Sequence, residues 1–331
     1  MSSMDKLKLQ GEPASPVSIL LDQATSTEAK VQVVRTVWYH TKTLFLFTKS
    51  DFKTVILPQS VFALVMALSG AGSILAPGKG PQEIVMRIPY MLFWLWLHLL
   101  VENIANQRMA EGILEDKENK PWRPIPAGRI TPSEAESLLR TIVPLAVGTG
   151  LLFGSFVPSV ALMTFIWMYN DLNGSSTGPV LRNIITTAGL SCFGWGAVAT
   201  LLSGEITPGG EHLLRNWMLI MALMMITTVQ AQDFPDTAGD IARGRKTIPL
   251  LYGFNFARRS LAALAIVWSI VCPAFWDVVP LAWLAPVGIG GAMAGLTLLR
   301  WDQSSNERVW QLWCLWQTAI YLLPLFSRAT V

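Results

Sequence analysis

Residues 86–106 read MRIPYMLFWLWLHLLVENIAN, and this apolar stretch decides the class of fold. Its formally charged residues are Arg87 and Glu102, which stand near its two ends. A helix needs about 20 predominantly apolar residues to cross the roughly 30 Å of a bilayer core. The stretch has that length and composition, so it predicts a transmembrane helix.

Similar stretches recur along the chain of 331 residues, which is 52% hydrophobic, is 14% charged and has a mean hydropathy of +0.42. Soluble domains carry about 25% charged residues, so this composition argues against a soluble enzyme, a disordered protein and a coiled coil. We expect an all-α integral membrane protein. About nine transmembrane helices are predicted, near residues 54–76, 86–106, 136–155, 157–170, 182–203, 214–231, 259–276, 279–299 and 309–327.

The first 50 residues differ from the rest of the chain. Residues 1–30 are polar, and we expect no signal peptide there because they lack an apolar core. Residues 31–50 mix apolar side chains with Arg35, His40 and Lys42, which predicts an amphipathic helix lying at the membrane interface. We therefore expect a cytosolic N-terminal segment, 1–50, followed by a nine-helix membrane domain, 51–331.

Basic residues gather in two of the loops between predicted spans, 106–135 and 232–258, whereas the turns at 155–158 and 277–280 contain no Lys or Arg. The positive-inside rule places the two basic loops in the cytosol. The net charge of +3 is too small to predict nucleic acid binding. Membrane lipid is the expected surrounding, and no obligate protein partner can be read.

The second basic loop, residues 232–247, reads QDFPDTAGDIARGRKT. Asp233, Asp236 and Asp240 stand at i, i+3 and i+7, positions that share one face of a helix. Three carboxylates on one face repel one another unless a cation lies among them, and oxygen ligands of this kind suit Mg²⁺. Three bases that could neutralise phosphate oxygens follow: Arg243, Arg245 and Lys246. The loop therefore predicts a site for a metal–diphosphate complex.

The first basic loop contains the same pairing of acids and bases, because residues 106–129 read NQRMAEGILEDKENKPWRPIPAGR. Gln107, Glu111 and Glu115 stand at i, i+4 and i+8, so on a continuous helix they would share a face. Candidate metal ligands are Asn106, Gln107, Glu111, Glu115 and Asp116, and candidate diphosphate-binding bases are Lys117, Lys120 and Arg123.

An ordinary solvated loop whose basic residues only set the topology is the alternative interpretation of either loop. Two loops that each pair carboxylates with bases at a membrane boundary favour a functional site, because ionisable groups at membrane depth are costly.

At these residues the chain resembles the UbiA superfamily of intramembrane prenyltransferases. Asp116–Arg129 is similar to the sequence after the family's first Asp-rich motif, and Asp233–Thr247 is similar to its second motif. Arg182, which follows Tyr169–Asp171, resembles part of a further loop that helps to close the pocket in such proteins. The resemblance adds Arg182 to the residues expected to bind the diphosphate. The resemblance implies helices around a central cavity, with Mg²⁺ and an isoprenyl diphosphate held at its cytosolic mouth.

The first motif departs from the usual pattern, because Gln107, Glu111 and Glu115 keep the spacing with side chains one carbon longer. A register ending at Asp116 would instead place Gly112 and Arg108 at the other ligand positions, and neither can bind a metal. The altered motif resembles a divergent branch of the family that includes UbiA-type terpene cyclases.

This resemblance implies a Mg²⁺-dependent membrane terpene cyclase. It would ionise an isoprenyl diphosphate, with farnesyl diphosphate as the expected substrate, and close rings from the resulting cation. The expected catalytic residues are Asp233, Asp236, Asp240, Glu111 and Glu115. The alternatives are a prenyltransferase that moves the isoprenyl group onto an aromatic or other acceptor, and a non-catalytic lipid-binding or transporter-like protein. If the source is eukaryotic, the expected location is the endoplasmic reticulum.

Overall fold

The computed structural model describes residues 36–69 and 80–328, and the chain divides into two compact units, Met1–Phe45 and Leu46–Val331. The predicted interfacial helix at 31–50 and the end of the first predicted span lie partly outside the described residues. Residues 36–48 are helical. The candidate site lies in the second unit.

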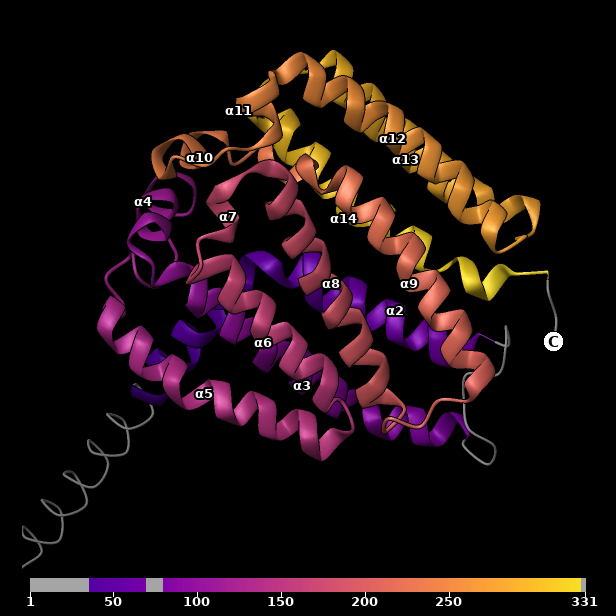
Figure 1. The fold of residues 1–331 in the computed structure, drawn as a ribbon, viewed down its shortest axis with the longest axis horizontal. Coiled ribbons are helices and arrows are strands. Elements are labelled where there is room, and N and C mark those ends of the chain that lie inside the picture. The colour runs from indigo at the N-terminus through magenta and orange to yellow at the C-terminus, as the bar shows by residue number, and fades with distance from the viewer. Residues whose placement is uncertain (1–35, 70–79, 329–331) are drawn as a thin grey trace, which may run out of the picture. The chain divides into compact units, whose positions relative to one another are not determined.

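Helices occupy all nine predicted span positions (Figure 1). Over the described ranges 36–69 and 80–328 none of the elements is a strand, and an isolated β-bridge joins Val278 to Ser327. The all-α membrane fold is therefore confirmed. The nine helices are α2 (Leu57–Leu68), α3 (Pro81–Gln107), α5 (Pro132–Phe153), α6 (Phe156–Asn170), α8 (Pro179–Leu201), α9 (Pro208–Thr228), α12 (Phe254–Phe275), α13 (Leu284–Leu299) and α14 (Gln303–Tyr321).

Seven helical stretches within the described residues are long and apolar enough to cross a membrane: Thr36–Leu68, Pro81–Gln107, Pro132–Phe153, Pro179–Leu201, Pro208–Asp233, Phe254–Phe275 and Pro280–Leu299. Helix α6 is a shorter apolar helix. Helix α14 is not among the seven, and its first turns contain Glu307 and Arg308. Together with the exposed leucines along the helices, such as Leu152, Leu281 and Leu299, this describes a multi-pass membrane protein.

Helix starts in this chain are set by local sequence signals. Pro81, Pro132, Pro179 and Pro208 each open a helix, where the missing proline N–H costs nothing. Helix α5 also begins with a capping box, in which the Thr131 side chain accepts from the Glu134 backbone and the Glu134 side chain accepts from the Thr131 backbone.

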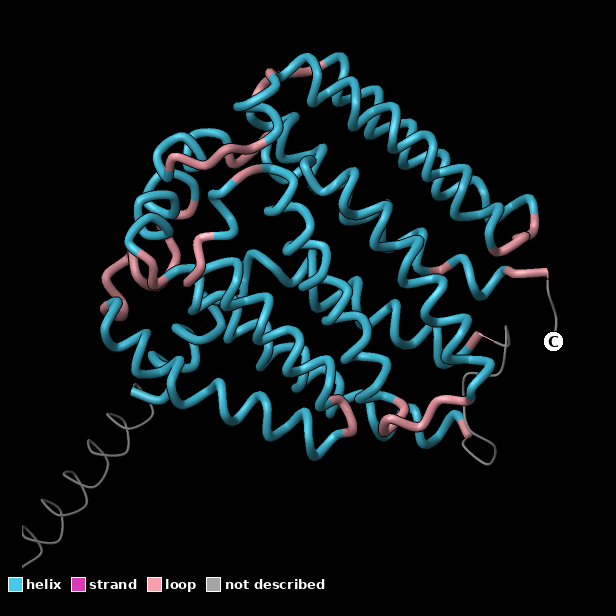
Figure 2. Tube along the Cα trace, in the orientation of Figure 1, coloured by secondary structure: helices cyan, strands magenta, loops and turns pink. Residues whose placement is uncertain are grey.

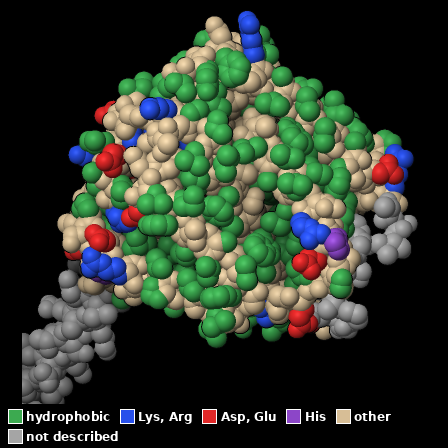
Figure 3. All heavy atoms as spheres, viewed as in Figure 1, with side chains coloured by type: hydrophobic (Ala, Val, Ile, Leu, Met, Phe, Trp, Pro, Cys, Tyr) green, Lys and Arg blue, Asp and Glu red, His purple; other side chains and the backbone are tan. Residues whose placement is uncertain are grey.

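Short elements connect the long helices and position the candidate site: η1 (Lys49–Asp51), η2 (Phe52–Ile56), α4 (Ala110–Asn119), α7 (Gly174–Thr177), η3 (Val229–Asp233), α10 (Thr237–Arg243) and α11 (Ile248–Tyr252). Figure 2 shows α4, α7, α10 and α11 gathered at one end of the long helices, whereas the α5–α6 and α12–α13 turns lie at the opposite end. In Figure 3, hydrophobic side chains cover the middle of the visible face and charged side chains gather toward its margins, as a membrane-embedded surface requires.

Candidate active site

The two basic loops meet in space, because α4 from the first packs against α10 from the second. Glu115 of α4 receives two arginines from the other loop. Arg243 Nη1 lies 2.9 Å from Glu115 Oε2, and Arg245 Nη1 lies 2.8 Å from Glu115 Oε1. All three side chains are buried, so residues more than 120 positions apart form one ion-paired group.

Two further carboxylates extend this group. Arg245 Nη1 also contacts Asp240 Oδ1 at 3.1 Å, and Arg182 Nη1 of α8 contacts Asp233 Oδ1 at 2.5 Å. We call the six residues the charge cluster: Glu115, Asp233, Asp240, Arg182, Arg243 and Arg245. Three carboxylates and three guanidiniums balance one another, which is the condition under which buried charges persist.

Two carboxyls of the charge cluster, Asp240 and Glu115, differ in the direction in which their surroundings shift the pKa. Burial raises the pKa of Asp240 to about 7 despite the neighbouring Arg182 and Arg245. Burial also acts to raise the pKa of Glu115, but Arg245 and Arg243 outweigh it, so the pKa of that carboxyl is lowered. Glu115 is therefore ionised at neutral pH, whereas the ionised form of Asp240 requires further stabilisation by a nearby cation.

Backbone contacts dock the two loops on each other. The Gly239 N–H donates to Asn119 Oδ1 at 3.2 Å, and Asn119 Nδ2 donates to the Asp236 carbonyl at 3.3 Å. A Cβ atom on Gly239 would overlap the Asn119 side chain and lie 2.8 Å from Glu115 Cγ. Glycine at this position lets α10 come close enough to α4 for the ion pairs of Glu115 to form.

The geometry expected for the first motif is wrong. Helix α3 ends at Gln107, Met109 is extended (φ −70°, ψ 141°), and α4 begins at Ala110, so Gln107, Glu111 and Glu115 do not share a helix face. Gln107 is buried and donates to the Phe47 carbonyl and to Asn103 Oδ1. Glu111 is exposed, and no hydrogen bond or ion pair joins it to another described residue.

The second motif is also not one helix. Asp233 ends η3, and Asp236 precedes α10, which contains Asp240. Asp233 and Asp240 are buried in the charge cluster, whereas Asp236 is half-buried and faces Lys120, with Asp236 Oδ2 3.7 Å from Lys120 Nζ. The expectation of three carboxylates on one helical face is therefore wrong, although the loop does bring all three to the same end of the molecule.

The remaining predicted residues fall into two groups. Asn106 lies in the last turn of α3. Asp116 lies next to Glu115 of the charge cluster, and its Oδ1 accepts from Arg123 Nη1 at 2.7 Å. Arg123 also donates to Ser50 Oγ at 2.9 Å. Lys117 and Lys246 are exposed to solvent.

The loop before Arg182 closes over this region. Arg108 Nη2 pairs with Asp171 Oδ1 at 2.5 Å, and Arg243 Nη2 donates to Ser175 Oγ at 3.3 Å. Tyr169 and Asn170 face a cavity described below. These contacts join the first basic loop, the second basic loop and the segment after α6.

A polar cavity of about 530 Å³ lies beside Asp236. Its charged lining residues are the carboxylates Asp51, Glu118, Asp236 and Glu307 and the ammonium groups Lys53 and Lys120. Because acids outnumber bases, a bare diphosphate would be repelled, whereas divalent cations placed between the diphosphate and the carboxylates would offset this repulsion.

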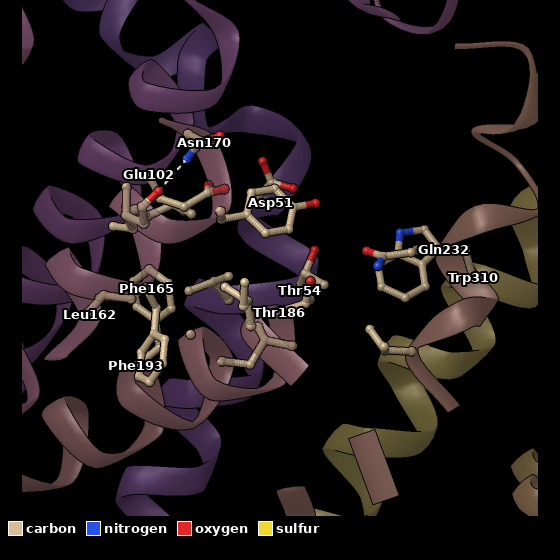
Figure 4. Close-up of a pocket in the computed structure, with 18 residues that line it drawn as sticks. Asp51, Thr54, Glu102, Leu162, Phe165, Asn170, Thr186, Phe193, Gln232 and Trp310 are labelled. Atoms are coloured by element: carbon tan, nitrogen blue, oxygen red, sulfur yellow. Dashed lines mark hydrogen bonds between the residues drawn. The ribbon is translucent and has the colours of Figure 1, made fainter. Parts of the chain in front are cut away.

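An apolar cavity of about 160 Å³ lies among α3, α6, α8 and η2 (Figure 4). Aliphatic and aromatic side chains supply most of its wall, including Leu162, Phe165, Phe193 and Trp310. Asp51 and Trp310 line both cavities, so the two adjoin. A ligand with a polar head and an apolar tail could therefore place one part in each.

The fit of a metal ion rests on the oxygens that remain without donors. In the described part of the chain no group of three or more His, Cys, Asp or Glu is already arranged around a metal position. Asp116 Oδ2, Asp233 Oδ2 and Asp240 Oδ2 are nevertheless buried without a hydrogen-bond partner. Unsatisfied carboxylate oxygens are costly in a protein interior and are the ligand type that Mg²⁺ prefers, so the residues present fit a divalent cation.

Several site residues were missed by sequence reasoning. Asp51, Lys53, Glu102 and Glu307 line the two cavities, but they stand outside both basic loops. Asn119 was read only as part of the loop, although it docks α10. The available signal was the placement of Asp51, Glu102 and Glu307 close to the ends of predicted spans.

Fold and site together define a multi-pass helical membrane protein with acidic and basic loops at the mouth of an apolar cavity. The sequence matches the model of the UbiA prenyltransferase family over residues 60–320, and the chain belongs to this family.

Two relatives and one solved structure illustrate the family. The chain is 34% identical to the fumagillin beta-trans-bergamotene synthase of Aspergillus fumigatus, over 87% of this chain and 93% of the relative. It is 27% identical to the somaliensene A/B synthase of Streptomyces somaliensis, over 91% and 98%. A UbiA homologue from Archaeoglobus fulgidus, solved with DMAPP and Mg²⁺, shares the fold with a TM-score of 0.55 at 14% identity, over 84% of this chain and 98% of that one.

Proposed function

We propose that this protein is a Mg²⁺-dependent membrane terpene cyclase that ionises an isoprenyl diphosphate, with farnesyl diphosphate as the first candidate, and cyclises the resulting cation. The observation that carries the proposal is the junction of a polar cavity beside Asp236 with an apolar cavity through Asp51 and Trp310. Similarity to two terpene synthases over most of their length supports the same choice of reaction.

Binding of the diphosphate head is assigned to the polar cavity. Lys120 and Lys53 present ammonium groups there, and Asp236 presents a carboxylate. Mg²⁺ would supply charge neutralisation of the leaving diphosphate when bound. Its proposed ligands come from Asp233, Asp236 and Asp240 in the second loop and from Gln107 and Asp116 in the first, whose Oε1 and Oδ2 atoms are buried without a hydrogen-bond partner.

The arginines of the charge cluster have a positioning role in this proposal. Arg182, Arg243 and Arg245 hold Asp233, Asp240 and Glu115 in fixed orientations through buried ion pairs. Preorganised charges stabilise developing charge without rearrangement at the moment of reaction. Arg182, Arg243 and Arg245 are also proposed, with Arg123, Lys117 and Lys246, as contacts of the diphosphate.

Cyclisation is assigned to the apolar cavity. Phe165, Phe193 and Trp310 offer aromatic faces toward a carbocation, which such faces attract electrostatically. The aliphatic wall keeps water from the cation, and exclusion of water prevents its capture as an alcohol.

A prenyltransferase would need a second binding site for an acceptor and often a base. The histidine within the second span, His98, is buried and hydrogen-bonded to Ser159 Oγ at 3.0 Å and to the Trp94 carbonyl at 2.8 Å. It is absent from the walls of the two cavities, so it serves the packing of α3 on α6 rather than an acceptor.

We also propose that the two basic loops face the cytosol, in the endoplasmic reticulum membrane if the source is eukaryotic. The turns at the opposite end of the helices, 155–158 and 277–280, contain no Lys or Arg.

The test is incubation of the purified protein in detergent with farnesyl diphosphate and Mg²⁺, without an acceptor, followed by gas chromatography. We expect a cyclic hydrocarbon from the wild type and from Glu211→Ala, an exposed change at the opposite end of the molecule, and none from Asp236→Ala. Hydrocarbon from Asp236→Ala at the wild-type rate would refute the site. No hydrocarbon from the wild type would favour the transferase, which is then assayed with geranylgeranyl diphosphate and aromatic acceptors.

A further inference from the structure

Cyclisation of an isoprenyl cation to a hydrocarbon ends with the loss of a proton, and the residues that bind the diphosphate do not account for this step. A neutral hydrocarbon forms only when the final cation loses a proton, so a base must touch the apolar cavity. The inference here rests on the proposed function and concerns the identity of that base.

The carboxyls in the wall of the apolar cavity are those of Glu102 and Asp51. Glu102 belongs to α3, one turn after Leu99, which also lines the cavity. Figure 4 shows Glu102 and Asp51 toward the same end of the cavity, with Phe165 and Phe193 toward the other. A substrate whose chain reaches the aromatic side chains would therefore pass both carboxyls.

Glu102 is the carboxyl of this pair that has no direct partner among the described residues. Asp51 Oδ2 accepts from Ser50 Oγ at 2.9 Å and lies 3.7 Å from Arg123 Nη2. No hydrogen bond or ion pair joins Glu102 to any other residue in the described part of the chain, although Arg123 and Lys120 place positive charge near it. An ionisable group on a membrane helix without a partner is costly, which favours a function over a role in packing.

We propose that Glu102 accepts the proton that ends the cyclisation. The C–O bond of the substrate has already broken, with its electron pair leaving on the diphosphate. A C–H bond next to the last cationic carbon then breaks, its electron pair forms a C=C bond, and the proton goes to a carboxylate oxygen of Glu102. The hydrocarbon is neutral, and the protonated Glu102 must be discharged before the next turnover.

Asp51 gives that proton a route out. It acts electrostatically on Glu102 and lines both the apolar and the polar cavity. A proton that leaves Glu102 past Asp51 reaches the polar cavity, where diphosphate or water accepts it.

The test compares Glu102→Gln with wild type by measuring two products of the same reaction, released diphosphate and hydrocarbon. We expect diphosphate release within about threefold of wild type and hydrocarbon lowered by about 100-fold or more, the usual range for loss of a general base. Alcohols from capture of the cation by water should replace the hydrocarbon. Glu102→Asp should restore part of the hydrocarbon, and Glu211→Ala, an exposed change at the opposite end of the molecule, should keep it.

Three outcomes would overturn the assignment. An unchanged hydrocarbon yield in Glu102→Gln would mean that another base, such as the released diphosphate, takes the proton. Equal loss of diphosphate release and hydrocarbon in a folded Glu102→Gln would place Glu102 in binding or ionisation. If Glu102→Gln does not fold, Glu102→Asp decides, because an unchanged ratio of hydrocarbon to alcohol there would refute the role. A wild type that forms no hydrocarbon refutes the proposed function itself.

Discussion

Replacing Glu115 by alanine tests whether the charge cluster holds the two basic loops together. The change removes the carboxylate that pairs with Arg243 at 2.9 Å and with Arg245 at 2.8 Å. Arg245 keeps its contact with Asp240, whereas Arg243 keeps only Ser175 Oγ at 3.3 Å. One guanidinium is thus left buried without a counter-charge.

Breaking a buried ion pair on one side costs about 3–5 kcal/mol. The exposed fractions of the Arg243 and Glu115 side chains are 3% and 9%, so solvent screens this pair little. Because Arg245 is compensated by Asp240, we expect the lower end of the range, about 3 kcal/mol, which is an increase of about 100-fold in the unfolding equilibrium constant.

The matched control is Glu111→Ala, which removes the same carboxyl from the same helix at an exposed position. Surface changes of this kind alter stability by about 0.5 kcal/mol or less. Denaturant-induced unfolding in detergent, followed by tryptophan fluorescence, measures both variants. Equal stability of Glu115→Ala and Glu111→Ala would refute the reasoning.

A second-site change sharpens this test. Arg243→Met in the Glu115→Ala background removes the orphaned charge, and we expect it to recover part of the lost stability. A double variant that is less stable than Glu115→Ala would mean that the guanidinium stabilises the fold through contacts other than the pair with Glu115.

Two further predictions concern the docking of α10 and the metal. Gly239→Ala places a methyl group against Asn119 and Glu115, and we expect a loss of about 1–3 kcal/mol in unfolding free energy. The control is Gly209→Ala, where a Cβ meets no atom within 4 Å. Equal stability of the two variants would contradict the close approach of α10 to α4. EDTA should stop hydrocarbon formation from farnesyl diphosphate, with recovery on addition of excess Mg²⁺, and activity that persists in EDTA would remove the divalent cation from the mechanism.

The membrane fold could be predicted from the sequence because the bilayer leaves few choices. Without water to satisfy backbone groups, long apolar stretches such as 86–106 must be helical, and their length is set by the thickness of the hydrocarbon. Helix starts at Pro132 and Pro208 follow from equally local rules. The two loops that contain the candidate site were also visible, because charged residues concentrate between apolar stretches.

The orientation of side chains within those loops depended on the tertiary structure. Spacing by four residues places Gln107, Glu111 and Glu115 on one face only if the helix continues, and the chain turns at Met109. The turn allows α4 to fold back on the end of α3, where the Asn106 carbonyl lies against Gly112 and excludes a larger residue. Such a break depends on packing between elements, which the spacing of residues along the sequence does not reveal.

Composition and hydropathy by themselves determined the helical membrane fold and the two chemically active loops, because both follow from the cost of placing polar groups in lipid. Only the tertiary structure decided that Glu115 pairs with Arg243 and Arg245, and that Asp51 and Glu102 from separate helices line one cavity. Ion pairs and cavity walls join residues that are distant in the chain, so the packing of the helices selects the partners.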